Sequence, residues 1–400
     1  MSQFTRDVAV VGGAGHVGLP LAIALADRGA RVVVYDVSER AVETVNSGVV
    51  PFAEPGAQPL LERALVDGRI TASTDPAVVA TAENVIVVIG TPVDEHLNPD
   101  PNAIPAALEA CSAYFRDGQL LVLRSTVYPG VTELVERMIS RLGLDIPVAF
   151  CPERIAEHRA MEELFSLPQI VSSRRDDGRA RAEALFRLLT EKIVHLDPEE
   201  AELAKLFTNT WRYIKFAAAN QFYMMANDRG LDFERIRAGL TQDYPRAQDM
   251  PGAGFAAGPC LFKDTMQLAA FSDNGFNLGH SAMLVNEGLP LYLVTRLEKR
   301  FDLSDKTVGI LGMSFKAGSD DIRSSLSYKL RRVLKFKAKA VIGTDPYVPE
   351  EVDDTLLPLE SVLEKADILV IATPHPEYRD LTTTKPVADV WNLLGSGVVV

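Results

Sequence analysis

A glycine-rich turn near the amino terminus limits how this chain can begin to fold. Segment 13–18 has the pattern G-x-G-x-x-G and follows the apolar run 8–11. A helical stretch (19–28) and a second apolar run (31–35) come next, and Asp36 ends that run. Glycines permit a tight turn and a close approach of the backbone to a pyrophosphate, which the helix N-terminus then faces. The order of these features predicts a parallel α/β domain that binds a dinucleotide.

The predicted cofactor contacts lie at this turn and at the ends of later strands. Asp36 would accept hydrogen bonds from ribose hydroxyls and repel a 2′-phosphate, so NAD is expected rather than NADP. The apolar runs 84–90 and 120–124 lead into polar or bend residues, which border the ligand crevice of an open α/β sheet. The expected contacts are Gly13, Gly15, His16, Val17, Gly18, Asp36, Thr91, Pro92, Ser125 and Thr126.

The alternation of strands and helices is interrupted once and then resumes. Residues 199–227 form one long helical pattern without internal Gly or Pro, and its apolar residues lie on several sides. Such a helix commonly forms a domain or dimer interface. The alternation returns near residue 305 without the glycine pattern. We therefore expect an NAD-binding Rossmann domain (1–196), a central helical domain (197–303) and a second Rossmann-like domain (304–400).

Composition narrows the class further. A chain of 400 residues is too long for a single core. The net charge of −13 argues against a surface that coats nucleic acid, and no apolar run approaches the roughly 20 residues that a membrane span needs. Three widely spaced cysteines form neither a disulfide framework nor a metal cluster. We expect a cytoplasmic protein without a signal peptide, a metal, a nucleic-acid partner or a membrane partner.

Segment 258–264 (Gly-Pro-Cys-Leu-Phe-Lys-Asp) places a thiol close to a cation and a carboxylate. Because residues 265–271 have helical character, Cys260 is expected at a helix N-terminus, where amide donors and the helix dipole favour the thiolate. Asp264 lies four residues further and would face the same side as the sulfur. Cys260 is either a catalytic nucleophile or a small buried hydrophobe, as most free cysteines are.

Two further pairs of polar residues allow both a functional and a structural interpretation. Lys205 and Asn209 lie four apart on the long helical pattern and share a face, which is either a site or a solvated surface. Thr126 and Glu153 each follow the end of a strand, where turn chemistry explains a polar residue equally well.

The segment after the strand 306–311 is basic. Lys316 and Arg323 could hold a diphosphate, with the arginine making a bidentate contact. The alternative is a basic surface loop that pairs with Asp320 and Asp321.

Five motifs occur in a specific order: Ser125-Thr126, Pro152-Glu153, Lys205-x-x-x-Asn209, Gly258-Pro259-Cys260-x-x-Lys263-Asp264, and Phe315-Lys316 through Arg323. With the glycine pattern, they make the chain resemble the UDP-glucose/GDP-mannose dehydrogenase family along essentially its full length. The resemblance implies two Rossmann-like domains joined by a long helix, 199–227, through which a homodimer forms. It also implies that NAD oxidises the C6 hydroxyl of a nucleotide-linked hexose to a carboxylate, with the removal of four electrons.

The resemblance also implies residue roles. Cys260 would carry a thiohemiacetal and then a thioester, and Lys205 and Asn209 would stabilise the oxyanion. Asp264 would activate water, supported by Glu153 and Thr126. The implied substrate contacts are Glu153, Arg154, Glu157, Lys205, Asn209, Arg246 (toward the partner subunit's substrate), Phe255, Gly258, Lys263, Phe315, Lys316 and Arg323.

Three questions stay open at this level. The sugar is UDP-glucose, a UDP-N-acetylhexosamine or a similar compound. A β-hydroxyacid dehydrogenase would share the glycine pattern and the Lys-x-x-x-Asn helix, but it would remove only two electrons and need no cysteine. A catalytically silent NAD-binding sensor or scaffold would bind NAD and produce no NADH.

Overall fold

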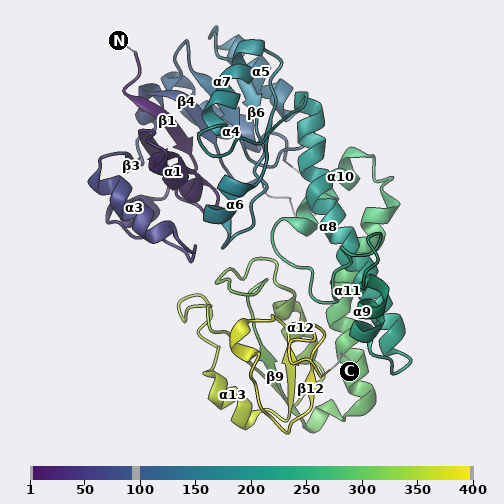
Figure 1. Cartoon of the computed structure of the whole chain (residues 1–400). Coiled ribbons are helices and arrows are strands. Elements are labelled where there is room, and N and C mark those ends of the chain that lie inside the picture. Colours follow the sequence, from purple (N-terminus) through teal and green to yellow (C-terminus); the bar gives the residue numbers. More distant parts are fainter. Residues whose placement is uncertain (1–2, 92–99, 397–400) are drawn as a thin grey trace. The chain divides into compact units, whose positions relative to one another are not determined.

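The computed structural model describes residues 3–91 and 100–396. Their contacts divide the chain into two compact units, Met1–Phe207 (the first unit) and Thr208–Val400 (the second unit), both shown in Figure 1. The expected three-domain division, with boundaries at 196/197 and 303/304, stays a prediction.

The first unit is built on a six-stranded sheet. Its strands are β1 (Arg6–Val11), β2 (Val32–Tyr35), β3 (Ile70–Ser73), β4 (Ala82–Val87), β5 (Leu120–Leu123) and β6 (Val148–Phe150). The order is β3-β2-β1-β4-β5-β6, and all neighbouring strands are parallel. This is the strand order of dinucleotide-binding folds, in which the ligand crevice lies where the order reverses, beside β1 and β4. The predicted fold class of this part of the chain is confirmed.

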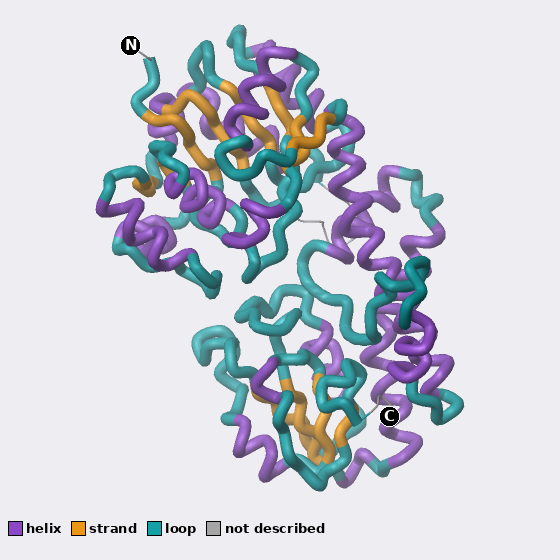
Figure 2. Tube along the Cα trace, viewed as in Figure 1, coloured by secondary structure: helices purple, strands orange, loops and turns teal. Residues whose placement is uncertain are grey.

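Helices cover both faces of this sheet, as Figures 1 and 2 show. The helices are α1 (Gly18–Asp27), α2 (Glu39–Asn46), α3 (Ala57–Val66), α4 (Ala103–Cys111), α5 (Val131–Arg141), α6 (Ala160–Ser166) and α7 (Asp176–Phe186). A small parallel pair, β7 (Gln169–Val171) and β8 (Ile193–His195), packs beside them. One core cluster joins the strands to α1, α3, α6 and α7, and another joins them to α4 and α5.

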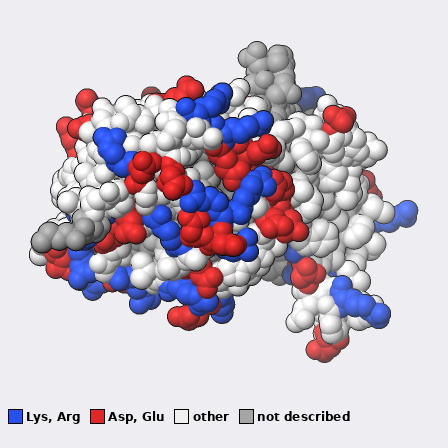
Figure 3. All heavy atoms as spheres, turned by 90° about the horizontal axis from the view of Figure 1, so that it is seen from above, with Lys and Arg blue, Asp and Glu red and all other residues white. Residues whose placement is uncertain are grey.

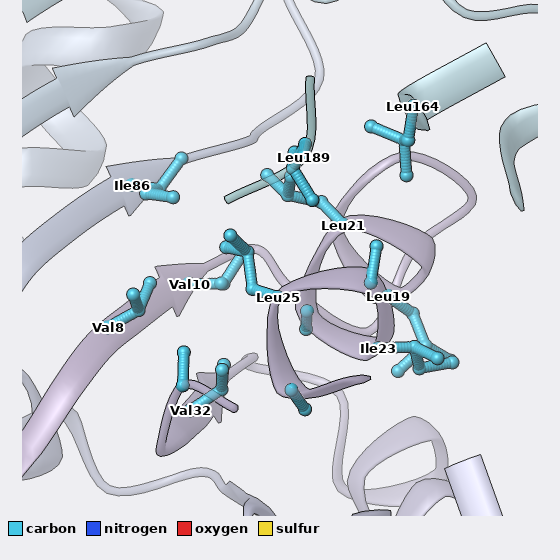
Figure 4. Packing of buried hydrophobic residues seen from close by; sticks show 14 of the residues in the cluster. Val8, Val10, Leu19, Leu21, Ile23, Leu25, Val32, Ile86, Leu164 and Leu189 are labelled. Carbon is cyan, nitrogen blue, oxygen red and sulfur yellow. The ribbon is translucent and has the colours of Figure 1, made fainter. Parts of the chain in front are cut away.

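The apolar run in β1 has a packing reason. Successive side chains of a strand point to opposite faces, so a sheet covered on both faces needs nearly every residue of the strand to be apolar. Val8 and Val10 pack toward α1, whereas Val11 belongs to the cluster on the other face. Figure 4 shows Val8 and Val10 near Leu21 and Leu25 of α1.

The second unit combines helices with a smaller sheet. Helix α8 (Pro198–Asn227) begins in the first unit and continues into the second, which also contains α9 (Phe233–Thr241), α10 (Leu261–Phe271), α11 (Asn277–Arg300), α12 (Leu326–Leu334) and α13 (Leu359–Lys365). The strands are β9 (Thr307–Leu311), β10 (Ala340–Thr344), β11 (Ile368–Ile371) and β12 (Val387–Ala388), and they form a parallel sheet in the order β10-β9-β11-β12. The predicted second Rossmann-like sheet is therefore present.

The described surface is mixed in charge. Figure 3 shows acidic and basic side chains interspersed over one face of the molecule. On the first unit, for example, Arg174 pairs with Glu136 and Glu199. None of the helices in the described ranges combines the length and the hydropathy that crossing a bilayer requires.

Replacing Leu21 by Ala tests the packing of α1 on the first sheet. Leu21 is fully buried in the core cluster, so we expect the substitution to lower the free energy of unfolding by about 2–5 kcal/mol. Val66→Ala is the matched control because Val66 is largely exposed, and its effect should stay within about 0.5 kcal/mol. Urea denaturation followed by circular dichroism measures both values, and equal effects would contradict the assigned packing.

Candidate active site

The glycine turn between β1 and α1 has the shape that a dinucleotide pyrophosphate requires. A Cβ added to Gly13 would lie 2.7 Å from the carbonyl oxygen of Val10, and one added to Gly18 would lie 2.6 Å from Cα of Gly13. These two glycines are therefore required by the protein's own packing. A Cβ on Gly15 would meet only the carbonyl oxygen of Gly12, at 4.0 Å. Gly15 thus leaves an open approach to the backbone, which fits a phosphate from outside the chain.

Asp36 lies just after β2 and contacts the glycine turn at residues 13–18, which is called the cofactor loop from here on. One carboxylate oxygen accepts the Ala14 N–H at 3.1 Å and the other accepts the Ser38 N–H at 3.1 Å. Each oxygen has a second lone pair with which it can accept a ribose hydroxyl. His16, in the same loop, stacks on Phe52 with ring centroids 4.1 Å apart. The chain's own residues therefore fit NAD as the sequence predicts.

Hydrogen bonds join the segments that follow β4 and β5. The Thr91 hydroxyl donates to the Thr126 carbonyl at 2.6 Å, and the Ser125 hydroxyl accepts the Ile89 N–H at 2.8 Å. Thr126 itself is half-buried at this edge. Pro92 lies outside the described residues.

Both carboxylate oxygens of Glu153, which follows β6, accept hydrogen bonds. Its Oε2 is paired with the buried guanidinium of Arg124, and its Oε1 accepts the backbone N–H groups of Arg154 at 2.7 Å and Ile155 at 3.1 Å. Arg124 also lies over the Phe186 ring at 4.6 Å. A carboxylate with these partners keeps the turn after β6 in one conformation.

The rest of this turn leads into α6. The guanidinium of Arg154 donates to the Pro168 carbonyl, and Glu157 is half-buried. His158 has a φ of 65°, a left-handed conformation that glycine adopts more easily than other residues. Its N–H donates to the buried carboxylate of Glu54 at 2.9 Å, and this contact favours the unusual backbone.

Lys205 is buried on α8, in the first unit. Glu202, three residues earlier, accepts the N–H groups of Gly130 at 2.7 Å and Thr132 at 2.8 Å. These bonds anchor the beginning of α8 to the N-terminus of α5, and so they fix the part of the helix that carries Lys205. Asn209 follows one turn later, on the same face.

Cys260 is the N-cap residue of α10 and is exposed, which confirms its predicted place at a helix N-terminus. Its carbonyl accepts the Asp264 N–H at 2.9 Å, so the two residues share the first turn of the helix. The other two cysteines are buried. Burial raises the pKa of the Cys111 thiol, and it raises the pKa of Cys151 to about 12. Of the three thiols, that of Cys260 is the accessible one, and it lies at a helix N-terminus.

Asp264 lies beneath this turn and is fully buried. Its Oδ2 accepts a hydrogen bond from the Asn209 side-chain amide at 2.6 Å. Its Oδ1 accepts no hydrogen bond from any residue that the structure describes, and Nζ of Lys263 lies 3.6 Å away. Leaving a buried carboxylate oxygen without a donor is costly.

The loop before Cys260 is fixed from two sides. The buried side chain of Asn220 accepts the Gly254 N–H at 2.9 Å and donates to the Gly254 carbonyl at 3.0 Å. Phe255 is buried next to it. Gly258 has a φ of +102°, and a Cβ there would lie 2.6 Å from the Phe315 ring. Asn220 is not among the residues predicted from the sequence, although it lies eleven residues, or three turns, beyond Asn209 on the same helix face.

Three of the predicted basic residues of the second unit lie in loops, namely Lys316, Arg323 and Arg246, whereas Lys263 lies in α10. Lys316 is half-buried after β9. Arg323 is exposed, and its guanidinium donates to the Asp321 carboxylate, with Nη2 and Oδ2 2.6 Å apart. The alternative interpretation of this segment, a basic surface loop that pairs with Asp320 and Asp321, predicted an ion pair with Asp321. Arg246 is also exposed and lies over the Tyr244 ring at 4.8 Å.

The structure thus gathers the predicted residues into two groups. The first unit carries the cofactor loop, the strand ends, Glu153 and Lys205, and the second unit carries Asn209 and Asp264 with Cys260 and the loops around it. Within the described ranges, no three His, Cys, Asp or Glu side chains are arranged to hold a metal ion.

Comparison with known proteins gives a consistent result along the chain. Three domain models of the UDP-glucose/GDP-mannose dehydrogenase family match it: the NAD binding domain at residues 6–190, the central domain at 199–287 and the UDP binding domain at 309–396.

Individual relatives match over most of their length. A UDP-N-acetyl-D-mannosamine dehydrogenase from Pyrococcus horikoshii is 32% identical over 92% of this chain and 90% of its own. An NDP-N-acetyl-D-galactosaminuronic acid dehydrogenase from Ralstonia nicotianae is 29% identical over 95% and 93%. A solved UDP-glucose dehydrogenase from Pyrobaculum islandicum is 29% identical, covers 97% of this chain and 94% of its own, and has a TM-score of 0.90. Its similarity extends over both units and supports the assigned fold.

Alkylation of the native protein tests the contrast among the three cysteines. With iodoacetamide at neutral pH we expect modification of Cys260, because it is exposed at a helix N-terminus, and protection of the buried Cys111 and Cys151. Peptide mass spectrometry measures the extent at each position, and the protein unfolded in urea is the control in which all three react. Preferential labelling of Cys151 in the folded protein would refute the assigned exposure.

Proposed function

Because this chain belongs to the UDP-glucose/GDP-mannose dehydrogenase family, we propose that it oxidises the C6 hydroxyl of a UDP-linked N-acetylhexosamine to the carboxylate. The family and the cofactor loop make it an NAD-dependent nucleotide-sugar dehydrogenase. The observation that carries the finer proposal is the first turn of α10, which contains both the exposed Cys260 and the buried Asp264, whose Oδ1 accepts no hydrogen bond from any described residue.

The proposed reaction converts the alcohol and one water molecule into a carboxylate, with the loss of two hydrides and three protons. NAD, which the glycine turn 13–18 and Asp36 would hold, would supply the hydride acceptor for each of the two oxidations. After the first, the Cys260 sulfur bonds to the aldehyde carbon and forms a thiohemiacetal, which retains the reactive aldehyde. Loss of the second hydride leaves a thioester. Water then breaks the carbon–sulfur bond and releases the acid and the thiol.

Asp264 suits the hydrolytic step. Its Oδ2 is fixed by Asn209, so Oδ1 is left to orient a water molecule and receive its proton. Asn209 and Lys205 would donate to the oxygen that becomes negative in the tetrahedral states. Glu153, whose oxygens already accept three hydrogen bonds, would support Thr126 and the water path by fixing the backbone after β6.

The substrate would be held through both of its ends. Lys263, Lys316 and Arg323 supply positive charge for the diphosphate. Phe255 and the turn at Gly258 would border the sugar. Arg154 and Glu157 would contact it from the turn after β6, and Arg246 would reach the partner subunit's substrate. Support for an N-acetylhexosamine comes from the relatives, since the first two described are named for N-acetylated sugars.

A substrate panel with Cys260→Ser tests the reaction. The wild-type protein should produce about two NADH per acid from a UDP-N-acetylhexosamine, measured by absorbance and by chromatography of the product. Without the thiol no thioester can form, so acid formation should fall about a thousandfold or more. Cys111→Ser is the matched control, because that buried thiol has no part in the reaction.

The same assay separates the rival functions. One NADH per product, with undiminished turnover in Cys260→Ser, would indicate a β-hydroxyacid type of dehydrogenase. NAD binding without NADH from any UDP-, TDP- or GDP-sugar would indicate a silent NAD-binding protein. Preference for UDP-glucose over N-acetylated sugars would contradict only the sugar assignment.

We also propose that the protein is a homodimer through α8 and α11. Large apolar side chains are exposed on both helices of the second unit: Trp211, Phe222 and Met225 on α8, and Leu278, Leu284 and Leu291 on α11. The two helices border a hollow of about 430 Å³, lined by residues that include Met224, Leu284 and Leu291. Exposed apolar side chains beside an apolar hollow favour association, and a second copy with the same surface is a suitable partner.

Replacing Leu291 by Asp tests this interface. A charge buried without a partner opposes association, so we expect the particle mass to fall from that of a dimer to that of a monomer. Size-exclusion chromatography with light scattering measures the mass. Phe336→Asp is the matched control, since Phe336 is an exposed apolar residue just beyond α12. A wild-type monomer, or an unchanged dimer in Leu291→Asp, would contradict the proposal.

A further inference from the structure

A buried histidine in the second unit contacts the loop that follows β9. His375 and Asp345 are both fully buried, with His375 Nε2 and Asp345 Oδ2 3.0 Å apart. The other ring nitrogen, Nδ1, accepts the Gly318 N–H at 3.1 Å. A backbone amide can only donate, so Nδ1 carries no proton and the Nε2–H donates to Asp345. Nε2 also lies 3.2 Å from the Ser314 hydroxyl, so the ring contacts Asp345, Ser314 and Gly318 and is fixed in one tautomer.

Asp345 fixes the beginning of the same loop. Its Oδ2 accepts the N–H groups of Met313 at 2.6 Å and Ser314 at 2.9 Å, in addition to the His375 ring. Burial alone raises the pKa of Asp345, but the hydrogen bonds from His375 and the backbone outweigh burial, and its pKa lies below the ordinary value. The carboxylate therefore stays ionised near neutral pH and keeps its acceptors.

The loop is held at both ends, and its middle carries two predicted substrate contacts. Asp345 holds residues 313–314 and His375 holds Gly318, and Phe315 and Lys316 lie between these points. The Ser314 hydroxyl donates to the Lys316 carbonyl at 3.0 Å. The Phe315 ring occupies the space beside Gly258, two residues before Cys260. A continuous set of contacts in one unit thus connects His375 to the segment of the nucleophile.

We propose that His375 is a positioning residue for nucleotide-sugar binding, acting through the Gly318 amide to hold Phe315 and Lys316 in their binding conformation. The inference rests on the proposed function, which gives this loop its role in binding the diphosphate. Without an acceptor at Nδ1, the Gly318 amide loses its partner and the loop is free to adopt other conformations. Nucleotide-sugar binding then has to order the loop, which weakens affinity.

Two substitutions separate the contacts of the ring. Asn at position 375 can present an acceptor near the place of Nδ1, whereas Gln reaches toward the place of Nε2 and can still donate to Asp345. We expect His375→Gln to raise KM for the nucleotide sugar about tenfold, and His375→Asn to restore most of the loss. KM for NAD should stay unchanged, since the predicted cofactor contacts belong to the first unit. His195→Gln is the matched control, because His195 pairs with Glu183 on the exposed surface of the first unit.

A merely structural role predicts a different result. If His375 only stabilised the fold, His375→Gln and His375→Asn would have the same kinetic constants, and KM for NAD would change together with KM for the nucleotide sugar. That outcome would overturn the inference. Calorimetric titration with free UDP keeps this test separate from the proposed oxidation, since it needs no turnover. Weaker UDP binding by His375→Gln than by His375→Asn supports the positioning role, and equal affinities overturn it. Failure of the wild-type protein to oxidise any nucleotide sugar refutes the proposed function alone.

Discussion

The hydrogen bond between Asn209 and Asp264 is the interaction on which the proposed chemistry depends. It joins α8 to α10 in the buried interior of the second unit and fixes one oxygen of a fully buried carboxylate. The other oxygen accepts no hydrogen bond from any described residue, and Nζ of Lys263 lies 3.6 Å from it. A buried charge with an open acceptor is unfavourable in a resting protein but useful in a site that must activate water. Cys260 is the N-cap residue of the same helix, so one helical turn of backbone connects the residue that carries the thiol to the residue that carries this carboxylate.

Several buried polar contacts prepare the surroundings of that turn. Asn220 holds Gly254 through both backbone groups, and Asp345 and His375 hold the loop that places Phe315 against Gly258. Each contact gives a backbone group of these loops a hydrogen-bond partner. The loops before Cys260 and after β9 are therefore positioned in advance, which reduces the ordering that the substrate must bring about. In the first unit, Arg124 and Glu153 do the same for the turn after β6.

Local patterns in the sequence predicted most of the fold and only part of the site. Apolar runs and the glycine pattern indicated both parallel sheets, because strand burial and the pyrophosphate turn each require particular residues at particular spacings. The helix after Cys260 was also evident. The partners of Asn220 and His375 were not, since each lies far away in the sequence: Gly254 is 34 residues from Asn220, and Gly318 is 57 residues from His375. Such contacts depend on how the elements pack, which periodicity does not reveal.

Trapping the bond between the sugar and Cys260 tests the central proposal most directly. In Asp264→Asn the carboxylate that would activate water is absent, while the amide is similar in size. The variant is mixed with NAD and a UDP-N-acetylhexosamine and then analysed by intact-protein and peptide mass spectrometry. We expect a nucleotide-sugar adduct on Cys260, formed with release of NADH. An unmodified Cys260, in a variant that still converts the sugar to its acid, would contradict covalent catalysis by this thiol.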